Sequence, residues 1–297
     1  MAKNEGIADV VVVGAGASGA AFTWSLAQAG INVVCLEQGG WVAEDAFPTS
    51  DADAQIHLQT DFHPDPGFRG LPADYPVNET ETPIAPLMYN AVGGSLIHWG
   101  AHFPRFHPSD FRVKTLEGVA EDWPVTYEEL EPYYDENDRM MGVSGLMGDP
   151  AYPEKPERPC PPLSIRKSGE LLAKALDKLG WHWWASDTAV SSVSYDGRDP
   201  DMGGFLRSFA SADLNYWPAA LKGGARLEIH ARVREILVDE SGNATGVLYY
   251  QDGELKEQKA KVVVLACNGI GTARLLLNST SAIFPNGLAN SSGLVGK

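Results

Sequence analysis

Cysteine is scarce in this sequence, and the spacing of the few that occur excludes several kinds of site. The 297 residues include three cysteines, Cys35, Cys160 and Cys267, and no two of them form a CxxC pair. A disulfide framework, an iron–sulfur cluster and a cysteine-based zinc site are therefore not expected. Cys35 and Cys267 lie in apolar, strand-like runs, so we interpret both as small core residues.

Positive charge and long apolar runs are scarce as well. Lys and Arg number 23 against 39 Asp and Glu, which gives a formal net charge of −16. This charge disfavours nucleic acid and anionic membranes as partners, although solubility alone also accounts for it. A membrane-spanning run of about 18 apolar residues is missing, and a strand-like run already begins by Val10, which leaves no room for a signal peptide. We expect a cytoplasmic chain, or a periplasmic one if a partner exports it.

What the sequence does contain is a glycine-rich turn between a strand and a helix near its start. The β-branched residues 10–13 lead into Gly14-Ala15-Gly16-Ala17-Ser18-Gly19, then into an apolar helical segment and a second strand at 33–36 that ends at Glu37. A GxGxxG turn alone is weak evidence. With the strand, the helix and the acidic residue at this spacing, it predicts a βαβ unit that holds a dinucleotide.

Each part of this motif has a physical role. Gly14 permits the tight turn after the strand, Gly16 lets the backbone approach a pyrophosphate, and Gly19 lets the helix lie close to the sheet. The N–H groups at the start of the helix attract phosphate. Glu37 is placed to accept hydrogen bonds from a ribose, and its charge argues against a 2′-phosphate there.

The middle of the chain alternates between irregular and regular segments. Residues 43–87 are rich in Asp and Pro and predict a long excursion, and residues 148–163 form a proline-rich linker or loop. Thr126 and Glu129 form a capping box at the start of a helix. The apolar spacing over 168–179, followed by Gly180, predicts a second helix and its end.

A tryptophan cluster follows that second helix. Trp181, Trp183 and Trp184 are expected in a strand outside the nucleotide-binding fold. Such a cluster can line a sugar site, but core packing is the favoured interpretation.

The last third returns to strands. Residues 226–230, 233–238, 245–251 and 260–265 have strand patterns separated by turns, and the last of these is apolar enough to be buried on both faces of a parallel sheet. It runs into Ala266-Cys267-Asn268-Gly269 and a further helix, which forms a second strand–turn–helix junction.

These features occur in the order found in glucose–methanol–choline (GMC) oxidoreductases, and the chain resembles the N-terminal portion of that family. The resemblance is strongest to the branch that contains gluconate and fructose dehydrogenase flavoprotein subunits and pyranose oxidase, since residues 93–99 read GGSLIHW, like the GG-x-x-x-HW signature of that branch. It implies an α/β fold with a Rossmann-like FAD-binding domain, a parallel sheet with an antiparallel excursion, and part of an α+β substrate domain. We assign 1–42, 88–147 and 216–297 to the FAD-binding domain, 43–87 to the excursion and 148–215 to a partial substrate or cap domain.

The resemblance also implies which residues hold FAD. The diphosphate would lie on the glycine turn, the ribose on Glu37, the adenine near Val233, and the isoalloxazine beside residues 93–100. The residues expected at the cofactor are Gly14, Gly16, Ala17, Ser18, Gly19, Glu37, Gly93, Gly94, Ser95, His98, Trp99, Gly100, Val233, Ala266 and Asn268. In pyranose oxidase-like members the histidine at the position of His98 is bonded to the flavin 8α-methyl carbon, and simple packing near the ring is the alternative here. His102, Arg105 and His107 are not assigned to catalysis, and no metal site is expected.

The family's proton-accepting histidine, paired with a histidine or an asparagine, is expected beyond Lys297. The main hypothesis is therefore an FAD-dependent enzyme that oxidises a CH–OH group of a sugar, polyol or other alcohol by hydride transfer to flavin N5. The alternatives are a non-catalytic FAD-binding subunit, or remnant, of a split flavoenzyme and a nicotinamide-dependent Rossmann enzyme. The partners would be the alcohol, an electron acceptor (oxygen, a quinone or another subunit), and a C-terminal half or partner chain that carries the base.

Overall fold

The computed structural model describes residues 6–43, 80–83, 88–195 and 209–297, which divide into two compact units. The first unit contains the described residues up to 98 together with 211–297, and the second contains 99–195 and 209–210. The excursion expected at 43–87 lies almost entirely outside the described residues. The division into FAD-binding and substrate domains stays a prediction.

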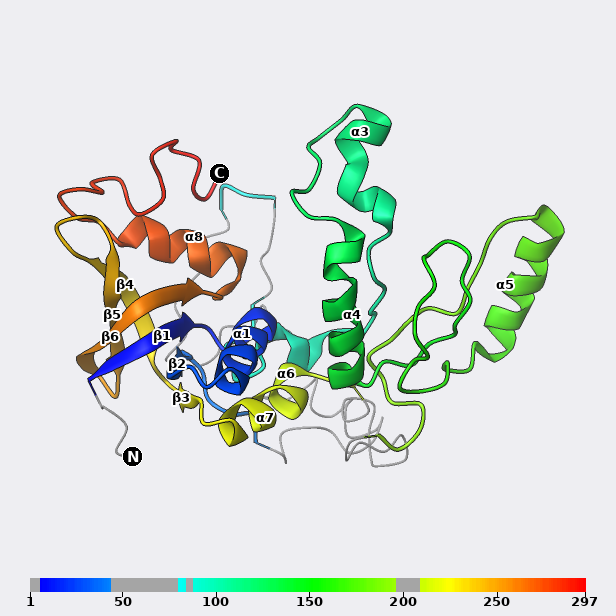
Figure 1. The fold of residues 1–297 in the computed structure, drawn as a ribbon, viewed down its shortest axis with the longest axis horizontal. Helices are drawn as coiled ribbons and strands as arrows, with labels where there is room; N and C mark the ends of the chain where they lie inside the picture. Colours follow the sequence, from blue (N-terminus) through cyan, green and yellow to red (C-terminus); the bar gives the residue numbers. More distant parts are fainter. Residues whose placement is uncertain (1–5, 44–79, 84–87, 196–208) are drawn as a thin grey trace. The chain divides into compact units, whose positions relative to one another are not determined.

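The first unit is built on one mixed six-stranded sheet (Figure 1). The strand order is β3-β2-β1-β6-β5-β4; β3, β2, β1 and β6 are mutually parallel, and β6, β5 and β4 are antiparallel. The strands are β1 (Ile7–Val13), β2 (Val33–Leu36), β3 (Arg226–Glu228), β4 (Arg232–Val238), β5 (Ala244–Gln251) and β6 (Glu254–Leu265). The predicted parallel sheet with an antiparallel excursion is confirmed.

The centre of this sheet is buried because β-branched residues fill it. Val11, Val12 and Val34 are fully buried, and β1 lies between β2 and β6. Helix α1 (Ala17–Gln28) begins just beyond the tip of β1, as Figure 1 shows in blue, and its buried residues are small: Gly19, Ala20, Thr23 and Ala27. Small side chains on this face allow the helix to approach the sheet closely. The short helices α6 (Ala212–Asn215) and α7 (Trp217–Lys222) contact α1.

Strand β6 differs from the expectation. It begins at Glu254, directly after a turn at Asp252 and Gly253, both with positive φ. Burial on both faces is wrong for this strand, because Val262 is 50% exposed. A parallel strand is buried on both faces only where helices cover both, and among the described helices α8 (Asn268–Asn278) packs chiefly against β4.

The second unit contains helices joined by long irregular segments. Its regular elements are the 3-10 helix η3 (Pro108–Arg112), α3 (Val113–Glu117), α4 (Tyr127–Met141) and α5 (Arg166–Leu179). The capping box at α4 is confirmed: Thr126 Oγ1 accepts from Glu129 N, and the Glu129 carboxylate accepts from Thr126 N. Helix α5 ends as expected at Gly180, whose φ of +66° suits glycine. Within the described residues, no helix combines the length and apolar character needed to cross a bilayer.

Candidate dinucleotide-binding site

The glycine turn has the sterics that a pyrophosphate cradle needs. Gly14 has φ +100°, and a Cβ there would lie 2.7 Å from the Ala266 carbonyl oxygen; a Cβ on Gly19 would lie 1.8 Å from the Gly14 carbonyl oxygen. Gly16 is different, since the nearest described atom to its hypothetical Cβ is Gly94 Cα at 3.9 Å. The protein's own packing therefore requires glycine at positions 14 and 19. At Gly16 the described residues leave space in which a ligand could approach the backbone.

The start of α1 faces this space with unopposed positive polarity. Ala17 and Ser18 occupy its exposed first turn, and that turn carries no acidic residue. The free N–H groups of a helix N-terminus and the helix dipole both favour an anion. The arrangement suits a phosphate.

Glu37 is held at the end of β2 by the glycine turn itself. Its side chain is buried, Oε2 accepts from Ala15 N at 2.8 Å, and Oε1 accepts from Gly39 N at 2.8 Å. Burial raises the pKa of this carboxyl, and the backbone hydrogen bonds oppose the rise. Each carboxylate oxygen can accept more than one hydrogen bond, so the carboxylate keeps acceptor capacity for a ribose.

The segment 88–98 lies directly against the glycine turn. Gly93 N donates to Ala15 O at 3.0 Å, and a Cβ on Gly94 would lie 2.9 Å from Gly16 Cα. Gly93 and Gly94 have backbone φ values of +99° and +58°, which residues other than glycine rarely adopt. The 3-10 helix η2 (Gly94–His98) starts at this point. Two motifs that are far apart in the sequence are thus brought together.

The other residues expected from this segment divide between the two units. Ser95 is exposed and its Oγ accepts from Tyr89 N; the His98 ring meets the Tyr89 ring edge-on, with centroids 4.3 Å apart. Trp99 and Gly100 fall in the second unit, where Trp99 Nε1 donates to Ala210 O at 2.8 Å.

The second strand–turn–helix junction also meets the glycine turn. Ala266 N donates to Val13 O, and its carbonyl faces Gly14. Asn268 has φ +58°, and its Oδ1 accepts from Ile270 N and Gly271 N, so its side chain caps α8.

Val233 lies near the site because the backbone just before it is hydrogen-bonded to the end of β2. Ala231 N donates to Glu37 O at 2.7 Å, which places the start of β4 beside the end of β2. The Val233 side chain is 7% exposed and belongs to the hydrophobic core. Only the backbone of Val233 is therefore suited to contact an adenine.

Two residues that sequence reasoning missed complete this region. Trp217 is fully buried, and its Nε1 donates to Ala15 O at 2.9 Å. Asp213 of α6 packs against Gly93, where a Cβ would lie 2.7 Å from Asp213 Oδ1. Neither belongs to a local motif, and the sequence separation of 202 between Trp217 and Ala15 leaves no pattern to detect.

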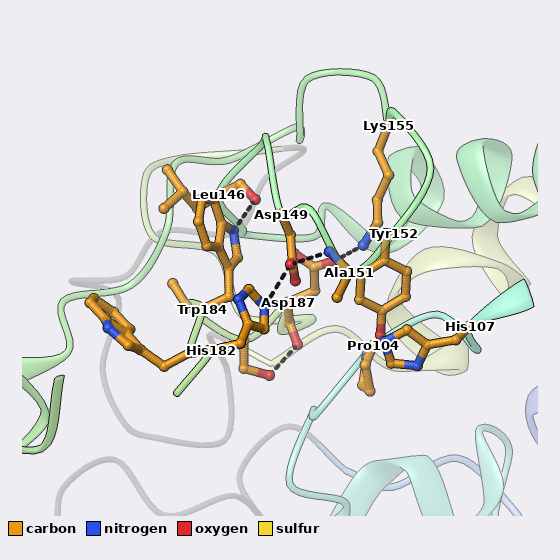
Figure 2. A pocket seen from close by; sticks show the side chains of 13 residues that line it. Pro104, His107, Leu146, Asp149, Ala151, Tyr152, Lys155, His182, Trp184 and Asp187 are labelled. Carbon is orange, nitrogen blue, oxygen red and sulfur yellow. Dashed lines mark hydrogen bonds and ion pairs between the residues drawn. The ribbon is translucent and has the colours of Figure 1, made fainter. Parts of the chain in front are cut away.

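The tryptophan cluster of the second unit does not form a core. Trp181 is 65% exposed, and Trp183 and Trp184 are half-buried beside a cavity of about 330 Å³ (Figure 2). The expected strand is wrong here as well, because residues 181–184 have no regular secondary structure.

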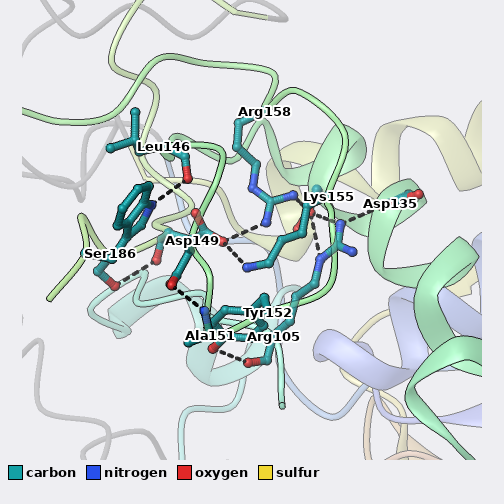
Figure 3. Close-up of polar contacts among 12 residues, drawn as sticks. Arg105, Asp135, Leu146, Asp149, Ala151, Tyr152, Lys155, Arg158 and Ser186 are labelled. Atoms are coloured by element: carbon teal, nitrogen blue, oxygen red, sulfur yellow. Dashed lines mark hydrogen bonds and ion pairs between the residues drawn. The ribbon is translucent and has the colours of Figure 1, made fainter. Parts of the chain in front are cut away.

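Arg105 takes part in a buried ionic network (Figure 3). This structural role accounts for the residue without a role in catalysis. Its guanidinium contacts Asp138 at 2.5 Å and Asp135 at 2.6 Å, Arg158 bridges Asp138 and Asp187, and Lys155 also contacts Asp187. Burial raises the pKa of Asp138, which the two arginines oppose. His107 stacks on Tyr152, and His102 forms an isolated β-bridge with Thr188. Among the described residues, no group of three or more His, Cys, Asp or Glu side chains is arranged to bind a metal ion.

Comparisons with known proteins agree with this geometry. The family model of the GMC oxidoreductases matches residues 8–287. A 2-methyl-1,2-propanediol dehydrogenase from Mycolicibacterium austroafricanum is 46% identical over 97% of this chain and 54% of its own length. The fructose dehydrogenase large subunit of Gluconobacter japonicus is 30% identical over 98% of this chain and 57% of its own length. The chain thus spans about half the length of these curated relatives.

Solved structures show the same fold at low sequence identity. Pyridoxine 4-oxidase from Mesorbium loti superposes with a TM-score of 0.63 at 17% identity, over 92% of this chain and 52% of that one. A formate oxidase from Aspergillus oryzae superposes with a TM-score of 0.58 at 16% identity, over 94% of this chain and 48% of that one.

Proposed function

Because the chain belongs to the GMC oxidoreductase family, we propose that it is the FAD-binding portion of an enzyme that oxidises a CH–OH group of a small alcohol, polyol or sugar. The family membership and the N-terminal placement expected from the sequence are confirmed. The observation that carries the proposal is the contact of the glycine turn with segment 88–98, through Gly93 N and Ala15 O at 3.0 Å.

The residues around the glycine turn fit an FAD. The open space at Gly16 is where a Cβ would fill a pyrophosphate cradle, and the first turn of α1 offers N–H donors to its oxygens. Glu37 would accept from the ribose hydroxyls, the backbone of Val233 would border the adenine, and Ala266 and Asn268 would border the diphosphate. Gly93, Gly94, Ser95 and His98 would line the ring, with Trp99 and Gly100 continuing that segment.

In the proposed reaction, the bound flavin supplies a hydride acceptor. The chain's own task is to fix that acceptor, by the rigid turn at Gly93–Gly94 and by the buried anchors Glu37 and Trp217. We place the base that removes the alcohol proton in the part of the relatives' length that this chain does not span. A histidine near neutral pH suits that proton transfer.

For the substrate, we propose a small vicinal diol. The 46% identity to a relative named as a 2-methyl-1,2-propanediol dehydrogenase exceeds the 30% identity to a fructose dehydrogenase subunit. The corresponding test substrates are 2-methyl-1,2-propanediol and fructose. Tert-butanol is the matched control, because it has a similar size and no hydrogen on its carbinol carbon.

The first experiment titrates the purified chain with FAD, NAD+ and NADP+ and follows binding by calorimetry. We expect saturable FAD binding that neither nicotinamide nucleotide displaces. Displacement of FAD by NAD+ would contradict the flavin assignment.

The second experiment follows flavin absorbance under anaerobic conditions. The FAD-loaded chain is expected to stay oxidised with each alcohol, and co-expression with the C-terminal part of the diol dehydrogenase relative is expected to allow bleaching by the diol and not by tert-butanol. Tight FAD binding without bleaching in that complex would favour a non-catalytic FAD-binding subunit, whereas bleaching of the chain alone would show that it contains its own base.

A further inference from the structure

The cavity in the second unit is bordered by aromatic rings on separate segments. His107 and Tyr152 are stacked with their ring centroids 4.1 Å apart, and the rings of His182 and Trp184 are nearly parallel. Both pairs line the same cavity of about 330 Å³ (Figure 2). That volume is at the lower end of the range of small-molecule sites, which is about 300–1,000 Å³.

Asp149 supplies this cavity with an acceptor that is already oriented. Its Oδ1 accepts from Ala151 N at 3.0 Å and pairs with His182 Nε2 at 2.9 Å. Its side chain is only 12% exposed, and among the described residues Oδ2 has no hydrogen-bond partner. A carboxylate oxygen fixed in this way is prepared to accept from a ligand hydroxyl.

Lys155 supplies positive charge at the same cavity. Its ammonium lies 3.5 Å from the centroid of the Tyr152 ring and 3.5 Å from Asp187 Oδ2. Asp187 is also bound by Arg158 at 2.8 Å, so its charge is compensated within the protein. Burial lowers the pKa of Lys155, and Asp187 opposes this shift.

These charges determine the kind of ligand that fits. An anionic ligand is attracted by Lys155 but repelled by Asp149, and a cationic ligand is attracted by Asp149 but repelled by Lys155, so a single charge gains little here to offset the cost of its desolvation. A neutral ligand meets neither penalty. Hydroxyl groups both donate and accept, so they match a wall that presents a carboxylate, an ammonium and imidazoles. The flat indole of Trp184 can cover an apolar C–H surface of such a molecule.

We propose that this cavity binds a neutral polyhydroxylated molecule of monosaccharide size. Asp149 Oδ2 accepts from one of its hydroxyls, Lys155 donates to another, the second ring nitrogen of His182 bonds a third, and Trp184 covers a C–H face. The inference does not depend on oxidation chemistry and concerns residues of the second unit alone.

The test is a saturation-transfer NMR titration of the full chain, with and without FAD. The probes are glucose and sorbitol as neutral polyols, gluconate as an anion and choline as a cation. We expect saturable binding of the neutral polyols, which gluconate and choline do not displace. Absence of saturable polyol binding, or preferential binding of either charged probe, would overturn the proposal.

Two variants locate the binding. Asp149→Asn retains the Oδ1 acceptor for Ala151 N but removes the charge, and we expect polyol binding to weaken about tenfold, the loss of one charge-assisted hydrogen bond. His182→Phe keeps a ring at a half-exposed position and removes both ring nitrogens, so it is also expected to weaken binding even if Asp149→Asn proves unstable. The matched controls are Glu157→Gln and Trp181→Ala, which change an exposed acid and an exposed tryptophan outside the cavity lining and should leave binding unchanged. If both cavity variants bind polyols as the parent chain does, the proposal is wrong.

Discussion

Replacing Gly16 and Gly19 by alanine, one at a time, should separate cofactor binding from folding. At Gly16 the backbone has φ −74° and ψ −162°, which alanine adopts without strain, and the nearest described atom to the new Cβ is 3.9 Å away. At Gly19 the new Cβ would lie 1.8 Å from Gly14 O and 2.9 Å from Gly14 C, both backbone atoms of the turn. The two substitutions add the same methyl group three residues apart.

These contacts, combined with typical energies, give the expected change in stability and in FAD affinity for each variant. Gly16→Ala should leave the free energy of unfolding of the FAD-free protein unchanged, or raise it by about 0.4–1 kcal/mol, because alanine restricts the unfolded chain. The same methyl group would keep the pyrophosphate away from the backbone. Loss of two charge-assisted hydrogen bonds corresponds to at least about 3 kcal/mol, on the order of 100-fold in the Kd for FAD. Gly19→Ala must push α1 off the turn, which we expect to cost about 3 kcal/mol of stability.

The assay pairs urea unfolding of the FAD-free proteins with calorimetric titration of FAD. Gly6→Ala is the control, since a Cβ there has no atom within 4 Å and the position precedes β1. The reasoning would be refuted if Gly16→Ala bound FAD like the parent chain, or if it unfolded as easily as Gly19→Ala.

Three further predictions concern single side chains. Asp138→Asn leaves two buried guanidinium groups undercompensated and should lower the free energy of unfolding by about 3–5 kcal/mol. The control Glu121→Gln breaks the exposed pair with Lys114 and should change the free energy of unfolding by less than about 1 kcal/mol. Equal urea midpoints for the two variants would contradict this prediction. Since burial raises the pKa of Glu37, the folded state binds its proton more tightly than the unfolded state, so this group's contribution to stability is greatest at low pH and falls as pH rises above the ordinary carboxyl pKa of about 4.3. Urea unfolding from pH 4 to 7 should show that decline relative to Glu37→Gln, and parallel pH profiles would refute it. If His98 forms the 8α bond, flavin stays with the acid-precipitated protein and is released from His98→Ala; complete release from the parent protein excludes the bond.

The nucleotide-binding half of the fold was predictable because its signals are local. One short stretch of chain contains β1, the glycine turn, α1 and β2. Within it the β-branched residues favour strands, the glycines favour the turn and the apolar segment favours a helix. The capping box of Thr126 and Glu129 was readable for the same reason, since both partners lie within one turn. In each case the physical cause is contained in the segment that shows the pattern.

The second unit was less predictable because its pattern of apolar and aromatic residues does not determine which elements those residues pack against. Trp181, Trp183 and Trp184 were expected in a strand, but a strand requires a neighbouring strand to pair with, and the described residues provide none for them. The apolar spacing over 168–179 predicted the helix α5 correctly, yet Leu171, Leu172 and Leu179 on it are 60–68% exposed. Periodicity indicates which residues share a face, and packing partners decide whether that face is buried.

The contact between the glycine turn and segment 88–98 belongs to a third class, predictable in part. The sequence motifs indicate that each element touches a cofactor, but they do not say which protein contacts hold the two elements together. The structure assigns that role to the Ala15 carbonyl oxygen, which accepts from both Gly93 N and the Trp217 indole, while Ala15 N donates to Glu37. The peptide groups flanking one alanine side chain thus link β2, segment 88–98 and α7. The shape of the cradle therefore depends on contacts made within the protein, chiefly those of the two Ala15 peptide groups.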